Sequence, residues 1–119
     1  YAHWMPSRPK IVGGLRTDAM LICNTRFSPF PLADIADMVK FCERIHRERG
    51  KGFALGKPID RFWLGFASHN GFEKQAIDYV NNFSEEKVGI ALIDIFREPH
   101  STCRSPNKNG EYTDHWFRV

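Results

Sequence analysis

One stretch of this sequence, residues 61–96, constrains the fold more than any other. It begins with a continuous apolar and aromatic run at residues 62–67, which is too short for a helix and is typical of a strand covered on both faces. After a polar break at residues 68–71, apolar residues recur at helical spacing, and a second buried run follows at residues 88–95. A strand, a helix and a strand form a βαβ unit, so we expect two parallel neighbouring strands with a right-handed crossover.

The helix inside this unit has an apolar stripe and a predicted N-terminal cap. Asn70 followed by Glu73 matches a variant of the capping box, which predicts that the helix begins near Phe72. Lys74 and Asp78 fall on the outward face. The apolar stripe consists of Phe72, Ala76, Ile77, Val80 and Phe83.

Upstream of this unit, the sequence predicts a hairpin and a long helix. Residues 10–12 and 19–23 are short apolar runs on either side of Gly13 and Gly14, so they can pair through a glycine-rich turn. Residues 32–49 combine an apolar stripe with acidic residues near their start and arginines near their end, as expected for a helix that complements its own dipole.

Both ends of the chain are predicted to lack long regular elements. Residues 1–9 contain two prolines and are predicted to form a loop. Residues 97–119 form a polar, turn-rich extension, in which Trp116 and Phe117 either dock as a last short strand or stay loose.

These elements predict an α/β fold in one domain over residues 1–119. The expected architecture is a small mixed sheet, made of a hairpin and a parallel βαβ unit, flanked by helices. The residues expected in the core include Ile35, Val39, Leu64, Phe66, Val80, Ile90 and Leu92.

Composition gives weaker indications. No apolar run is long enough to cross a bilayer, so we expect no membrane association through a span. The three cysteines are odd in number and far apart, which favours a reduced, cytoplasmic protein. The chain begins at Tyr1 without a methionine, so we expect it to be part of a larger protein, and self-association stays open.

Several short sequence motifs follow the order found in a known nuclease family. They are Gly13-Gly14, Asp18, the segment 68–72, Ala76, Tyr79 and the strand 92–94. In these motifs the chain resembles the Mrr-like branch of the restriction-endonuclease-like nucleases. The resemblance implies a restriction-endonuclease-like core over residues 11–96, with residues 97–119 as an extension.

The resemblance also implies a site for DNA cleavage. Asp18 matches the acid that holds Mg²⁺ in this family, where the metal polarises the scissile phosphate. In the family the acid begins one hairpin strand and an acid-x-Lys triplet lies on the next. Laid over this sequence, the triplet falls on Ile22-Cys23-Asn24, which contains neither an acid nor a lysine, and Arg26 is the nearest cation. Two readings follow: Mg²⁺-dependent DNA cleavage with Asp18 and Arg26 as catalytic residues, or an inactive nuclease-fold module that binds DNA or a protein partner.

Cations gather in residues 44–61, at the end of the predicted long helix and in the loop after it. Long basic side chains in this position can follow a phosphate backbone. A solvated helix end explains them equally well. The residues predicted to contact nucleic acid are Arg16, Arg44, Arg47, Lys51, Lys57, Ser68 and Asn70.

Two of these side chains, Ser68 and Asn70, belong to a turn between a parallel strand and a helix, where free amides favour anions. A structural turn and helix cap is the simpler reading of this segment. For Asp18, the simpler reading is a turn residue that satisfies backbone amides. Binding of a small molecule at the same turn is a third reading, although no phosphate-loop pattern supports it.

Overall fold

The computed structural model describes residues 2–6, 10–12, 15–24, 26–49, 61–95 and 101–117. It contains both predicted parts, a hairpin and a βαβ unit, in one mixed sheet. The elements are β1 (Ala2–Pro6), β2 (Lys10–Val12), β3 (Leu15–Asn24), α1 (Leu32–Arg49), β4 (Arg61–Ser68), α2 (Lys74–Asn81), β5 (Val88–Asp94), β6 (Ser101–Arg104) and α3 (Lys108–Phe117).

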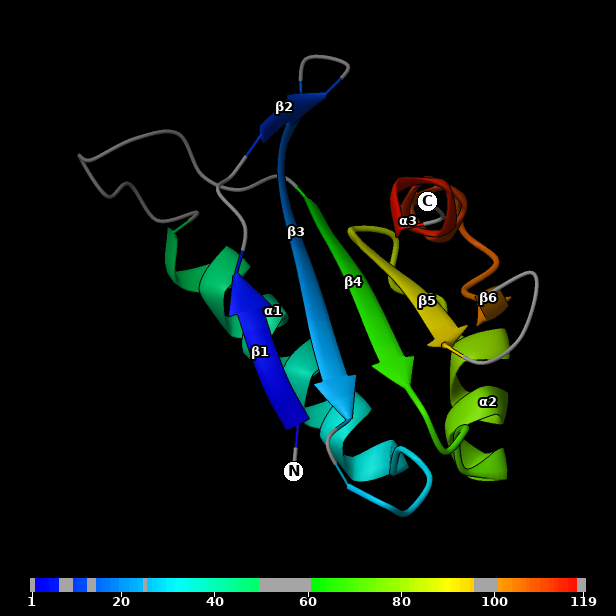
Figure 1. Ribbon diagram of the computed structural model, residues 1–119. Coiled ribbons are helices and arrows are strands. Elements are labelled where there is room, and N and C mark those ends of the chain that lie inside the picture. Colours follow the sequence, from blue (N-terminus) through cyan, green and yellow to red (C-terminus); the bar gives the residue numbers. More distant parts are fainter. Residues whose placement is uncertain are drawn as a thin grey trace.

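Three parallel strands form the centre of the sheet, as Figure 1 shows. The strand order is β1-β3-β4-β5-β6, with β2 also paired to β3. β3 and β4 are parallel, β4 and β5 are parallel, and β1, β2 and β6 each run antiparallel to their neighbours. The predicted parallel pairing of residues 62–67 with 88–95 is therefore confirmed. β2 does pair antiparallel with β3, but its partners are residues 15–17 and not the predicted residues 19–23, because β1 pairs with that end of β3.

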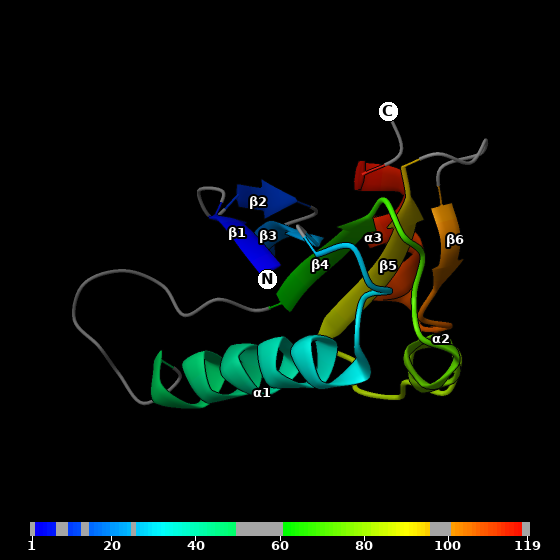
Figure 2. The same ribbon diagram turned by 60° about the horizontal axis from the view of Figure 1, so that its bottom comes forward.

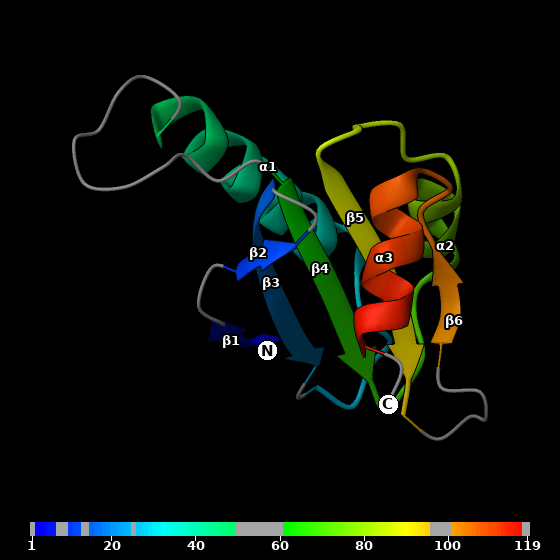
Figure 3. The same cartoon turned by 90° about the horizontal axis from the view of Figure 1, so that it is seen from above.

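The sheet lies between two helical layers. Both crossover helices, α1 and α2, cover one face, whereas α3 lies across β4 and β5 on the other face (Figures 2 and 3). No helix among the described residues is long and apolar enough to span a membrane.

The main core fills the space between the sheet and the two crossover helices. Side chains on a strand alternate between the two faces, so every second residue of β4 points to α1 and α2. Phe62, Leu64 and Phe66 do so and are 0–1% exposed. All seven residues predicted for the core are buried: Ile35, Val39, Leu64, Phe66, Val80, Ile90 and Leu92.

The two ends of the chain differ from the expectation. The predicted loop at residues 1–9 contains β1, which pairs with β3 from Met20 to Asn24. The predicted polar extension contains β6 and α3, so Trp116 and Phe117 belong to a helix and not to a strand or a loose tail. The sequence of α3 lacks a regular apolar stripe, because polar and glycine contacts fix this helix to the sheet. The apolar pattern therefore gave no indication of a helix here.

The start of α2 also differs from the expectation. The helix begins at Lys74, and Glu73 occupies the N-cap position without a capping hydrogen bond from its side chain. The predicted capping box of Asn70 and Glu73 is therefore wrong. Both side chains are instead used between loops, at the edge of the sheet described next.

Candidate nucleic-acid interface

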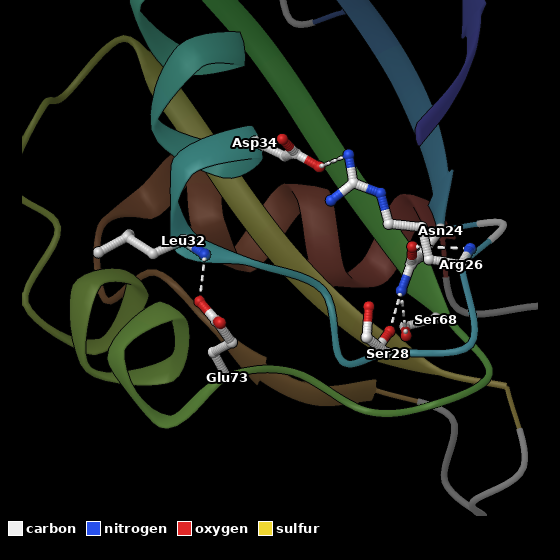
Figure 4. Close-up of polar contacts among 7 residues, drawn as sticks. All are labelled: Asn24, Arg26, Ser28, Leu32, Asp34, Ser68 and Glu73. Carbon is white, nitrogen blue, oxygen red and sulfur yellow. Dashed lines mark hydrogen bonds and ion pairs between the residues drawn. The ribbon is translucent and has the colours of Figure 1, made fainter. Parts of the chain in front are cut away.

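The carboxyl ends of β3 and β4 meet at Asn24 and Ser68, which are partners in the strand register. Both side chains are buried, at 3% and 0% exposure. The Asn24 amide nitrogen donates to the Ser28 carbonyl at 2.8 Å and to the Ser68 hydroxyl at 3.3 Å, while its oxygen accepts the Arg26 amide at 3.1 Å. Figure 4 shows that Asn24 thereby ties the strand ends to the following loop.

The loops after β3 and β4 are also joined directly. Asn70 donates from its side chain to the Arg26 carbonyl at 2.9 Å, and its backbone amide donates to the Ser68 hydroxyl at 3.2 Å. Phe30 and Gly71 form a backbone hydrogen bond at 3.0 Å. Ser68 and Asn70, which the sequence placed at a candidate anion site, therefore hold two loops together.

Glu73 connects the starts of the two crossover helices. Its carboxylate accepts a hydrogen bond from the amide of Leu32, the first residue of α1, at 3.0 Å (Figure 4). An acceptor at this point satisfies one of the amides that a helix start leaves unpaired, and its negative charge complements the helix dipole. Glu73 thus caps a helix 41 residues away in sequence.

Arg26 lies beyond this edge and is partly exposed. Its guanidinium forms an ion pair with Asp34 at 3.8 Å, with side-chain exposures of 45% and 27%. The distance and the exposure indicate a weak contact, because water screens both charges.

Asp18, the other predicted catalytic residue, lies far from Arg26. It is six residues before the end of β3, which corresponds to roughly 20 Å along the strand. Asp18 is half-buried on the face that packs against α1, near Cys42. Burial, followed by the charges of Asp18 and Glu43, raises the pKa of the Cys42 thiol to about 12.

Among the described residues, the surroundings of Asp18 do not fit Mg²⁺. Its partner in the β4 register is Phe62, and the next two residues on the same strand face are Met20 and Ile22, each 2% exposed. Mg²⁺ requires several oxygen ligands in an octahedral arrangement. In the described parts of the chain, no group of three or more His, Cys, Asp or Glu side chains could hold a metal ion.

Among the described side chains, the outward face of α1 carries three cations. Lys40, Arg44 and Arg47 are exposed and follow the i, i+4, i+7 spacing of one helix face. We call these three residues the α1 basic stripe. The Arg44 guanidinium lies 5.6 Å from the centre of the Phe41 ring. Asp37 and Glu43 lie beside the stripe and line the same shallow pocket.

The other predicted cations divide into two groups. Arg61, at the end of the sequence cluster, is only 7% exposed and donates to the Thr17 hydroxyl at 2.6 Å, so it does not extend an exposed cluster. Lys51 and Lys57 lie outside the described residues, and Arg16 lies on β3 with its side chain outside them.

Sequence reasoning missed two residues at these surfaces. Lys40 precedes Arg44 by four residues, a spacing that could have identified it. Phe27 is 99% exposed in the loop after β3, and no periodic pattern could have indicated this.

No family model matches this sequence, and neither a curated protein nor a solved structure matches it.

Proposed function

We propose that this domain binds a nucleic-acid backbone without cleaving it, as an inactive module of the restriction-endonuclease-like fold. The observation that carries the proposal is the environment of Asn24. This residue stands where the resemblance places the family's lysine, and it is 3% exposed with its amide engaged by three partners. A side chain used in this way supports the loop and brings no cation to a phosphate or an attacking water.

The position of the missing acid supports the same reading. Ile22 stands at the acid position of the family's triplet and is 2% exposed in the core. Metal-dependent hydrolysis of a phosphodiester needs ligands on the metal and a positioned nucleophile. Asp18 alone supplies one carboxylate, and the cleaving alternative therefore requires an acid that the matched segment does not contain.

The fold part of the proposal rests on topology. In the resemblance, a helix follows the hairpin and a further strand follows the helix, and the acid and the acid-x-Lys triplet lie on successive hairpin strands. This chain departs from that pattern, because Asp18 and Ile22-Cys23-Asn24 lie on one strand, β3. Here β2 and β3 form the antiparallel pair, and β3 leads through α1 into the parallel strand β4. The order agrees with the resemblance without being unique to it.

The α1 basic stripe supports contact with a phosphate backbone. Its three cations lie on one exposed helix face, where they can approach phosphates without desolvating the core. Asp37 and Glu43 reduce the local charge to one net positive unit, so we expect modest affinity and no sequence preference. The competing explanation is a solvated surface with no ligand.

Fluorescence anisotropy with a labelled duplex tests this proposal. In the double variant Arg44→Gln/Arg47→Gln, two phosphate contacts are lost. We expect weaker binding and a salt dependence, in a plot of log K against log salt, that is shallower by about 2.

The matched control is Lys74→Gln/Lys108→Gln, which removes the same charge from exposed positions on α2 and α3. It should change the affinity much less and leave the salt dependence of duplex binding close to that of the native chain. Equal effects of the two double variants, or no effect of either, would contradict a contact through the α1 basic stripe.

A further inference from the structure

Phe27 is exposed to an extent that packing does not explain. Its side chain is 99% exposed, whereas the other large exposed apolar residues of the described chain, Tyr112 and Trp116, are 43% and 37% exposed. Those two rings also pack against Trp63, with centroid distances of 6.0 and 5.5 Å. Phe27 therefore presents both faces of its ring to solvent.

The backbone on both sides of Phe27 is held in place. The amide of Arg26 donates to Asn24 and its carbonyl accepts from Asn70, while the carbonyl of Ser28 accepts from Asn24. Phe30 is then bonded to Gly71. A fixed backbone lowers the conformational entropy that is lost on binding, so binding through an exposed ring on such a loop costs less free energy.

The neighbouring cation can serve the same ligand. Arg26 precedes Phe27, and its guanidinium forms the loose ion pair with Asp34 at 3.8 Å. Exposed pairs of this kind contribute little stability. The guanidinium can therefore turn to a phosphate at small cost, and Asp34 keeps the net charge of this edge low.

We propose that Phe27 stacks on an unpaired nucleobase, with Arg26 beside the adjoining phosphate. An aromatic face and a phosphate-binding cation on consecutive residues match the two parts of one nucleotide. Bases within a duplex have both faces covered by their neighbours, so the contact selects single strands or unpaired ends. This inference deepens the proposed function by naming the form of nucleic acid that this loop takes.

Stacking should differ from the α1 basic stripe in its response to salt. Contacts with phosphates release counterions, whereas stacking on a ring does not. Loss of the Phe27 ring should therefore lower single-strand affinity and leave its salt dependence unchanged. Loss of the α1 basic stripe should instead make the salt dependence shallower.

The experiment uses a short oligothymidine that carries one 2-aminopurine, whose fluorescence is quenched when the base stacks. Phe27→Ala and Phe27→Leu should each weaken single-strand binding at least about fivefold and remove the quenching, and Phe27→Trp should retain both. Duplex binding should remain unchanged in all three variants. Because Phe27 is exposed, thermal unfolding of each variant should match that of the native chain.

Three results would overturn the inference. Phe27→Leu could bind the single strand as tightly as the native chain, which would show that the contact needs apolar volume and no aromatic stacking. Phe27→Ala could leave single-strand binding and quenching intact while the stripe variant weakens duplex binding, which would leave the proposed backbone contact standing. A native chain that binds duplex but no single strand would also contradict stacking and leave the proposed backbone contact standing. Conversely, loss of quenching in Phe27→Ala with no effect of the stripe variant would support stacking and contradict the stripe.

Discussion

The two faces of β4 are packed by different chemistry. Toward α1 and α2, Leu64 and Phe66 are completely buried among apolar side chains, and the Phe66 ring meets Phe30 edge to face at 5.4 Å. Toward α3, Trp63 donates from its indole nitrogen to Asn109 at 3.2 Å, and Gly65 lies under the ring of Phe117. One face is held by apolar volume. The other is held by close backbone approach and hydrogen bonds, together with the packing of Tyr112 and Trp116 on Trp63.

The α3 face depends on glycine at two points. A Cβ at Gly89 would collide with the backbone of Asn109, and a Cβ at Gly110 would collide with the backbone of Ser105. Where the helix is this close, Ser105 accepts from the Ile90 amide at 3.0 Å and Asn107 donates to the Val88 carbonyl at 2.9 Å. A helix can therefore be positioned on a sheet with little apolar patterning in its own sequence.

The largest effect should follow removal of an aromatic ring from the apolar face. Phe66→Ala leaves a cavity in the buried apolar cluster, next to the ring of Phe30. We expect it to lower the free energy of unfolding by about 3–5 kcal/mol. Urea denaturation monitored by circular dichroism measures this change, and a cost below that of Gly89→Ala would contradict the assignment of the main core to this face.

A smaller effect should follow the addition of a methyl group on the α3 face. Gly89→Ala places a Cβ against the backbone of Asn109, so α3 must move away from β5, and we expect a cost of about 3 kcal/mol. The near-ultraviolet signal of Trp63 and its neighbours should change with it, because those rings bridge β4 and α3.

Gly65→Ala is the matched control on the same face. The added Cβ would lie 2.8 Å from a ring atom of Phe117, a side chain that can rotate away, so the cost should be about 1 kcal/mol. Equal destabilisation by the two substitutions would show that general crowding, and not the contact of β5 with the α3 backbone, positions the helix.

The same contrast explains how much of the fold could be predicted. Apolar runs and helical spacing identified α1, β4 and β5 within a few residues, since those elements bury continuous apolar faces. β1 was missed because two prolines indicated a loop. α3 was missed because its contacts rely on glycine, asparagine and serine, residues that sequence reasoning assigns to turns.

The candidate site was less predictable than the fold. Ser68, Asn70 and Glu73 were recognised as important from the break between strand and helix, but the loop that they bind lies some 40 residues earlier in the chain. Such partners depend on strand register, which no local pattern reveals. The burial of Arg61 and the exposure of Phe27 also depend on tertiary packing.

The most direct test of the account is a plasmid-nicking assay with Mg²⁺ or Mn²⁺, comparing the native chain with Asp18→Ala. The central claim is a nucleic-acid-binding domain whose matched catalytic positions have become structural. We therefore predict that both proteins leave the same background fraction of supercoiled plasmid nicked, under salt conditions in which the native chain binds duplex. Nicking by the native chain that disappears in Asp18→Ala would contradict the claim and establish Asp18 as part of a working nuclease site.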